Sequence, residues 1–364
     1  KCDTAFAEPN TGACRECIIT SRRFLAAAFF KVLVILVPIL FFANSYCFGR
    51  EQPKPSLTGV STYANSYGNY NARTLSKFLK FDAVVIEPYD VPNINFLKKL
   101  KKNGVIIFAY ISVGEAGPNR RYFKNWRSYG NTPDNPDIPR SKVVSGDPVF
   151  IDEDPGWPGS FYADTSSPRW HRIILEEEIP YVLWLGKGLY DGLFLDVIDA
   201  ADVYASRKNG LNMIDGMVKL VKKIREKYPE KLIMANRGFT ILKDIAPYID
   251  AMKFEEYTSA YGNIRGGERY GEYYVNFDEK GRRTNENDVK ALEAALKINP
   301  SIKVFILDHV NTSPPDRRTA RLCFHEAVRL SERLGQKVLW YANSVHQDLP
   351  VWPDFDKRIH GGGR

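Results

Sequence analysis

The stretch that decides the fold is GLFLDVI at residues 192–198, an apolar run that carries one carboxylate near its end. The run is short, rich in branched and aromatic side chains, and preceded by Asp191, as buried parallel strands are. Inside such a strand Asp196 would be largely desolvated, which is costly unless the carboxylate has a partner or a task. We therefore expect a buried strand that ends at a functional site.

Seven similar apolar runs occur along the chain, and amphipathic stretches separate most of them. The eight runs are 58–63, 83–86, 105–111, 192–197, 232–235, 251–255, 304–307 and 338–341. The helical patterns are 71–80, 92–102, 168–187, 209–228, 285–298 and 316–335. This alternation predicts an α/β fold, a (β/α)8 TIM barrel in a single domain over 57–350. A doubly wound sheet is the alternative, but no glycine-rich phosphate turn follows any run.

The spacing is interrupted once, by a long insertion between the third and fourth strands. Positions 114–168 contain eight of the 22 prolines, together with Trp126 and Trp157. A loop of this length inside a compact domain is either functional or disordered. The aromatic residues favour an ordered loop that roofs the site.

The region before the barrel has the pattern of a targeting segment. Residues 24–43 are mostly apolar, follow two arginines and precede a small-x-small motif at 43–45. This pattern predicts a signal peptide or membrane anchor over 24–45 and a secreted, periplasmic or cell-surface location. Residues 1–23 are then an N-terminal extension without a folded role, and 351–364 form a C-terminal tail.

Composition excludes several classes of protein. The net charge of +8 comes without a cluster of basic residues, so no nucleic-acid footprint is present. Four of the five cysteines precede residue 50, which leaves only Cys323, a buried structural thiol by its apolar neighbours. The five histidines show no paired ligand spacing and no GxSxG elbow occurs, so we expect neither a metal nor a cofactor.

Polar residues follow the strand candidates, and the carboxyl ends of barrel strands converge on one face. The candidates there are Glu87, Tyr110, Glu115, Asp196, Asp199, Asn236, Glu255, Glu256, Tyr257 and Asp308. The sequence thus predicts carboxylates from five strands around one mouth, with His309 as a polar residue of the rim.

Pleat alternation discriminates between the adjacent residues Glu255 and Glu256. Successive side chains of a strand face opposite ways. Because Met252 and Phe254 suit the surrounding helices, Lys253 and Glu255 should point toward the barrel axis. Glu255 is therefore the candidate and Glu256 the alternative.

Two carboxylates in one pocket are the minimal apparatus for cleaving a glycosidic bond. One is protonated and assists the leaving oxygen, while the other is ionised and acts as nucleophile or as base for water. Their like charge raises the pKa of one of them, as the acid requires. Asp196 and Glu255 are the predicted pair.

The sequence resembles glycoside hydrolase family 114, the endo-α-1,4-polygalactosaminidase-type barrels, and is similar to the hydrolase domain of Pel polysaccharide proteins. The matching segments are AYISVGEAG (109–117), FYADTSSPRW (161–170), LYDGLFLDVIDA (189–200), LIMANRGF (232–239) and YIDAMKFEEYTSAYG (248–262). The resemblance implies a (β/α)8 fold, secretion and hydrolysis of polymers containing α-1,4-linked galactosamine.

By residue matching, the resemblance also implies roles for individual side chains. Asp196 and Glu255 correspond to the catalytic acids of the family. Glu115, Asp164, Asp199 and Asn236 would line the sugar site. Glu256 and Tyr257 depart from the usual residues after the catalytic Glu, so the choice between Glu255 and Glu256 stays open.

We therefore expect an exported endo-acting glycoside hydrolase whose partner is an amino-sugar polysaccharide or oligosaccharide. Two other hypotheses remain: a cell-surface carbohydrate-binding barrel without turnover, and a hydrolase of another glycan, since a fold does not determine a substrate. The sequence leaves open which carboxyl is protonated. It also leaves open the distance between the two carboxyl groups, and with it retention or inversion of configuration.

Overall fold

The computed structural model describes residues 54–68, 70–123, 149–204, 212–264 and 266–347. All of them belong to one compact unit that begins at Lys54. The predicted extension over 1–23, the leader over 24–45 and the tail over 351–364 lie outside the described residues, as does Trp126. No helix of the described ranges has the length and apolarity needed to cross a membrane.

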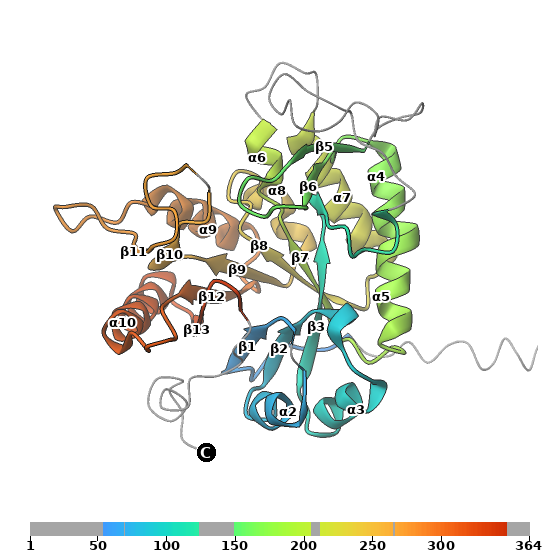
Figure 1. Ribbon diagram of the computed structural model, residues 1–364, viewed down its shortest axis with the longest axis horizontal. Coiled ribbons are helices and arrows are strands. Elements are labelled where there is room, and N and C mark those ends of the chain that lie inside the picture. Colours follow the sequence, from blue (N-terminus) through green and yellow to red (C-terminus); the bar gives the residue numbers. More distant parts are fainter. Residues whose placement is uncertain (1–53, 69, 124–148, 205–211, 265, 348–364) are drawn as a thin grey trace, which may run out of the picture. The chain divides into compact units, whose positions relative to one another are not determined.

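Eight parallel strands form the centre of this unit, and helices lie outside them (Figure 1). In sheet order they are β1 (Tyr63–Ser66), β2 (Ala83–Ile86), β3 (Ile106–Ser112), β7 (Gly192–Asp196), β8 (Leu232–Asn236), β9 (Ala251–Glu255), β12 (Lys303–His309) and β13 (Leu339–Asn343). The last strand returns beside the first, where the Asn343 amide donates to the Asn65 carbonyl oxygen at 3.0 Å. The predicted (β/α)8 TIM barrel is confirmed.

The helices follow the predicted amphipathic stretches. The longer ones are α2 (Ala72–Phe78), α3 (Ile94–Lys102), α5 (Ile179–Leu185), α7 (Met213–Lys227), α9 (Glu286–Ile298) and α10 (Arg317–Leu334). Short helices are α4 (Pro168–Arg172), α6 (Ala200–Tyr204) and α8 (Leu242–Ile245), with 3₁₀ turns η1 (Pro88–Asp90) and η5 (Ala246–Tyr248). A π-helical turn, η4 (Ile173–Glu178), joins α4 to α5. On α7 the apolar residues at three- and four-residue spacing, such as Met217 and Leu220, are buried.

The first strand begins later than the sequence suggested, at Tyr63 rather than at 58. The Asp82 carboxylate accepts hydrogen bonds from the backbone amides of Ser61 and Thr62, at 2.9 and 3.0 Å. Gly59, at φ 82°, belongs to the turn before them. The backbone amides of Ser61 and Thr62, which the prediction had assigned to a strand, thus bond to a side chain. The observed strand begins at Tyr63 and includes Asn65.

The described part of the insertion is a small sheet rather than a loop. Strands β4 (Glu115–Ala116), β5 (Phe150–Glu153) and β6 (Phe161–Ala163) pair antiparallel in the order β4-β6-β5. The chain enters β4 through Gly114, where a Cβ would lie 1.9 Å from the Val197 carbonyl oxygen. Only glycine allows this approach, which brings Glu115 near the carboxyl end of β7. A second hairpin, β10 (Ser259–Tyr261) and β11 (Tyr273–Val275), follows β9.

Candidate active site

One side-chain amide, at the end of β8, bridges the two predicted carboxylates at the carboxyl ends of the strands on either side, β7 and β9. Asn236 Nδ2, at the end of β8, donates to Asp196 Oδ1 at 2.6 Å and to Glu255 Oε2 at 2.7 Å. The two accepting oxygens can therefore be no further apart than the sum of these bonds. Asp196 on β7 and Glu255 on β9, 59 positions apart in the sequence, are therefore brought together by Asn236.

Glu255 is surrounded by hydrogen-bond donors. Oε2 also lies 3.0 Å from Lys253 Nζ, while Oε1 lies 3.0 Å from both His309 Nε2 and Gln347 Nε2. The Glu255 side chain is 15% exposed and the Lys253 side chain is fully buried. Four donors, two of them basic groups, therefore hold this carboxylate in place.

Lys253 is held in turn from β1 and β7. Its Nζ lies 3.3 Å from Asn65 Oδ1 and 4.3 Å from the centroid of the Phe194 ring. The Asn65 amide also donates to the side-chain oxygen of Gln347. A buried ammonium needs such partners, because an unpaired charge in the barrel interior would be strongly unfavourable.

The surroundings move the pKa values of the two carboxyls in opposite directions. Burial, together with the charge of Glu255, raises the pKa of Asp196. Burial also acts to raise the pKa of Glu255, but Lys253 and His309 outweigh it and lower that pKa well below its usual range. Burial acts to lower the pKa of His309, but its bond to Glu255 raises it. The surroundings therefore favour the ionised form of Glu255 and the protonated form of Asp196 relative to ordinary carboxyls.

Backbone strain is concentrated at this site. Val197, Arg237 and Glu256 directly follow the three bridged residues, and all have positive φ, at 60°, 54° and 61°. Gln347, a donor to Glu255, has φ 50°. Only one other described residue besides glycine, Lys187, has positive φ. A β-branched residue such as Val197 rarely adopts this conformation, and strain of this kind gathers at functional sites.

A second pair of acidic side chains lies at the same mouth. Glu115, at the start of β4, is hydrogen-bonded to Asp154 and accepts from Ser160 Oγ at 2.8 Å. Burial, and then the bond to Asp154 and its charge, raise the pKa of Glu115 to about 9. Because the charge of Asp196 also acts on Glu115, the two pairs influence each other electrostatically.

Of three more predicted residues at these strand ends, one contacts the bridged pair. Tyr110 is hydrogen-bonded to Asp196. Arg237 Nε donates to Asp199 Oδ2 at 3.0 Å, and its Nη1 lies 3.4 Å from Glu256 Oε2. Asp199 and Glu256 are therefore tied to a guanidinium rather than to the carboxylate pair.

The remaining predicted residues have structural partners in the described part of the chain. Glu87 forms a two-pronged ion pair with Arg120, at 2.9 and 2.7 Å. Asp308 accepts from the backbone amides of Thr258 and Ser259. Tyr257 packs beneath the Arg283 guanidinium, 3.9 Å from its ring centroid, and Asp164 accepts from the Ser166 hydroxyl at 2.5 Å. None of these contacts joins the four residues to Asp196 or Glu255.

Sequence reasoning missed several partners of Glu255. His309 is not a rim residue: it is 3% exposed and faces Glu255. Lys253 was predicted to point toward the axis but was not included in the site. Gln347 was missed because it follows the last strand. Asn65, the partner of Lys253, was missed because the predicted first strand ended before it. Alternation along β12 would have found His309, whereas the contacts of Gln347 depend on closure of the barrel.

Two buried polar atoms next to the bridged pair lack protein partners. Within the described ranges, Asn236 Oδ1 and His309 Nδ1 are buried and have no hydrogen-bond partner. Atoms of this kind are available to a bound molecule, because burial without a partner is unfavourable. Across the same ranges no cluster of His, Cys, Asp and Glu is arranged to hold a metal ion.

An acidic pair at the mouth of a (β/α)8 barrel is typical of enzymes that cleave glycosidic bonds. The model of glycoside-hydrolase family GH114 matches residues 53–311. The chain therefore belongs to this family.

Individual relatives agree over shorter stretches. An uncharacterized protein of Deinococcus radiodurans is 26% identical over 212 residues, which is 56% of this chain and 62% of that protein. The chain thus spans less than two thirds of that relative, and 41% and 55% of two further uncharacterized relatives.

Two solved structures share the fold. A single-residue variant of the glycoside hydrolase domain of PelA from Pseudomonas aeruginosa is 20% identical with a TM-score of 0.57, over 80% of this chain and 98% of that domain. Ega3 of Aspergillus fumigatus, solved in complex with galactosamine, is 12% identical with a TM-score of 0.53, over 83% and 97%.

Proposed function

We propose that this chain is an endo-acting hydrolase of α-1,4-linked galactosamine polymers, and that Asp196 and Glu255 carry out the reaction. The observation that carries the proposal is the single Asn236 amide that bonds both carboxylates, at 2.6 and 2.7 Å. Retaining glycosidases hold their carboxyl groups about 5–5.5 Å apart, and inverting ones roughly 6.5–9.5 Å apart. The close bridged arrangement supports retention of configuration.

The opposite pKa directions suggest the two roles. Glu255, kept ionised by Lys253 and His309, attacks the anomeric carbon. Asp196, whose pKa is raised, gives its proton to the glycosidic oxygen as the bond from that oxygen to the anomeric carbon breaks. The first product leaves, and the remaining sugar is an ester of Glu255.

Water completes the reaction. Asp196, now a carboxylate, takes a proton from a water molecule whose oxygen attacks the anomeric carbon and releases the Glu255 carboxylate. Both groups return to their starting protonation. The profile of kcat/KM against pH should therefore be bell-shaped: it falls at low pH as Glu255 gains a proton and at high pH as Asp196 loses one.

The preference for an amino sugar rests on the acidic mouth. Besides the bridged pair, Glu115 is hydrogen-bonded to Asp154, and a sugar ammonium beside these two carboxyls would be attracted to them. The galactosamine bound to Ega3 supports this choice of sugar. We further propose that the enzyme acts outside the cytoplasm, because of the apolar segment over 24–45.

The test is cleavage of galactosamine oligomers by the purified chain, with Asp196→Asn and Glu255→Gln as variants. We expect kcat to fall by at least about 10³-fold in each, since each removes an essential carboxyl. Asp244→Asn and Glu332→Gln, both on exposed helix positions, are matched controls and should keep full activity. Cleavage that persists in both active-site variants would overturn the pair.

Azide distinguishes the roles. Added to Glu255→Gln it should restore turnover of an activated substrate and yield a glycosyl azide of inverted configuration, because azide replaces the nucleophile. Added to Asp196→Asn it should give the retained azide. The opposite pattern would exchange the two roles, and an inverted first product from the native enzyme would reject retention.

A further inference from the structure

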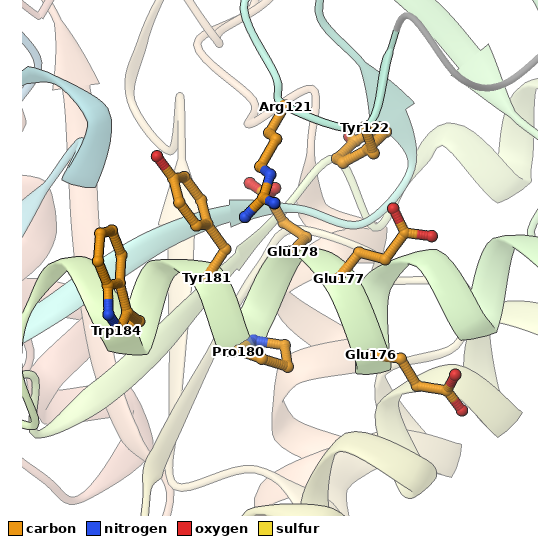
Figure 2. Close-up of a pocket in the computed structure, with 8 residues that line it drawn as sticks. All are labelled: Arg121, Tyr122, Glu176, Glu177, Glu178, Pro180, Tyr181 and Trp184. Carbon is orange, nitrogen blue, oxygen red and sulfur yellow. The ribbon is translucent and has the colours of Figure 1, made fainter. Parts of the chain in front are cut away.

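A pocket of about 490 Å³ lies on the outer side of the barrel wall, away from the bridged pair. Its lining comes from η4, from α5 and from the segment after β4, and Figure 2 shows these side chains. The volume falls within the usual range for small-molecule sites. No residue of the bridged pair lines it.

An ordered row of aromatic side chains forms one side of this pocket. The rings of Tyr181 and Trp184 stack, with centroids 5.6 Å apart and planes 21° apart. The Arg121 guanidinium lies 4.9 Å from the Tyr181 ring centroid. Tyr181 is also in contact with Tyr89, whose hydroxyl donates to Glu178 at 2.9 Å. The row is therefore anchored to the barrel wall before any ligand arrives.

The end of this row is open to solvent. Trp184 is 67% exposed, more than any other large apolar side chain of the described residues. The exposed indole is held in place by its stacked neighbour Tyr181 and borders the pocket. It offers a flat apolar face whose π-system attracts cations and whose surface suits the apolar face of a sugar ring.

A carboxylate stands beside the aromatic row. Glu177, Tyr181 and Trp184 follow one another at four and three residues, so they lie along one stripe of the helix. Figure 2 shows these side chains on the same side of the helix as Arg121, whereas Glu176 and Pro180 lie on the other side. Glu176 and Glu177 are exposed, and the three glutamates of the lining outnumber its one arginine, so the pocket is acidic on a chain of net charge +8.

We propose that this pocket is a second glycan-binding site, which holds an amino-sugar unit of the polymer outside the active site. One sugar ring lies on Trp184, and the ammonium of a further unit of the same polymer pairs with the Glu177 carboxylate, about 10 Å away along the helix. Such a site keeps a long chain near the catalytic mouth and raises its effective concentration there. The identity of the sugar rests on the proposed function, whereas the aromatic and acidic groups do not.

The test measures retention of the full chain on immobilised, partly deacetylated polygalactosamine by affinity electrophoresis. Glu255→Gln serves as the background so that the polymer is not cut. Adding Trp184→Ala should weaken retention about tenfold, as expected for loss of one aromatic anchor. Adding Glu177→Gln should weaken retention on the deacetylated polymer but not on a fully acetylated one. The exposed substitutions Leu322→Ala and Glu332→Gln on α10 are the matched controls.

Turnover separates this inference from the proposed function. In the otherwise native chain, Trp184→Ala should leave cleavage of short oligomers unchanged and reduce cleavage of the polymer. Retention that is the same with and without Trp184 overturns the second site, even if short oligomers are cleaved. Retention that depends on Trp184 in a chain that cleaves no galactosamine oligomer supports the second site and rejects the proposed reaction.

Discussion

Carboxylate side chains lie at both ends of the barrel, but their surroundings differ between the two ends. At the amino end, Asp82, Asp191 and Asp250 each directly precede a strand and accept a backbone amide of the neighbouring strand's start. The amides are those of Thr62, Ile107 and Ile233, at 3.0, 2.9 and 2.8 Å. Asp191 and Asp250 also have basic partners, Lys101 and Arg225. Each of these three carboxylates therefore joins two strands, and two of the three are paired with a basic side chain.

At the carboxyl end the carboxylates are close to one another. Asp196 and Glu255 share one amide donor, and Glu115 is bonded to a further carboxyl. The residues that follow the strands here are strained, as the positive φ of Val197 shows. We infer that the carboxylates of the amino end stabilise the fold. At the carboxyl end, stability is reduced in exchange for neighbouring carboxyls whose pKa values differ.

The largest stability effect should come from the amino end. Asp250→Ala removes the ion-pair partner of Arg225 and leaves the Ile233 amide without its acceptor. We expect the free energy of unfolding to fall by about 2 kcal/mol, and Tm by about 4–8 °C. Calorimetry measures Tm, and kcat on oligomers at 25 °C should stay within about twofold.

The matched control is Asp244→Ala, at an exposed position of α8, which should change Tm by less than about 1 °C. A large loss of kcat in the folded Asp250→Ala protein would contradict the division of labour between the two ends.

The sequence predicted the barrel because its strands are buried on both faces. Strands β2 and β9 have the predicted bounds, and most others differ by one or two residues. Alternation along β9 correctly placed Lys253 and Glu255 on one face, since Lys253 Nζ contacts Glu255. Local pattern is enough where a strand's own side chains determine which way it faces.

Contacts between segments that are distant in the sequence could not be predicted from local patterns. The first strand was misplaced because the Asp82 side chain, 20 residues away, accepts a hydrogen bond from the Thr62 amide just before β1. The partners of Glu255 come from three strands and from the segment after β13, so their meeting depends on the register of the whole barrel. The outer pocket was missed for a different reason. The sequence pattern does not show whether Trp184 on its helix is buried or exposed, and the exposure appears only in the structure.

The next effect, in the opposite direction, should come from Glu115 at the carboxyl end. Its native pKa of about 9 lies above the ordinary 4.5, so the native state holds a proton that the unfolded chain releases between these values. The contribution of Glu115 to stability is therefore fully present below about pH 4.5 and is lost as the pH rises toward 9. Glu115→Gln keeps the shape without this loss and should raise Tm by about 2–4 °C at pH 7.

The sign is checked by calorimetry across pH. The Tm difference between Glu115→Gln and the native chain should vanish below about pH 4.5 and increase above it. Glu332→Gln, on the surface of α10, should show no such trend. A Tm that falls in Glu115→Gln at pH 7 would mean that the ionised carboxylate stabilises the fold.

The smallest effect should distinguish the two adjacent glutamates of β9. Glu256 lies after the strand, at φ 61°, and its nearest basic partner is Arg237 at 3.4 Å. A partly exposed pair of this kind contributes about 0–1 kcal/mol. We therefore expect Glu256→Gln to lower kcat/KM by less than about fivefold, while the same substitution at Glu255 abolishes turnover. Steady-state kinetics on galactosamine oligomers with the two single variants and the double variant makes the comparison. Equal losses in the single variants would mean that the left-handed turn carries Glu256 into the reaction, and the carboxyl end would then hold three working carboxylates instead of two.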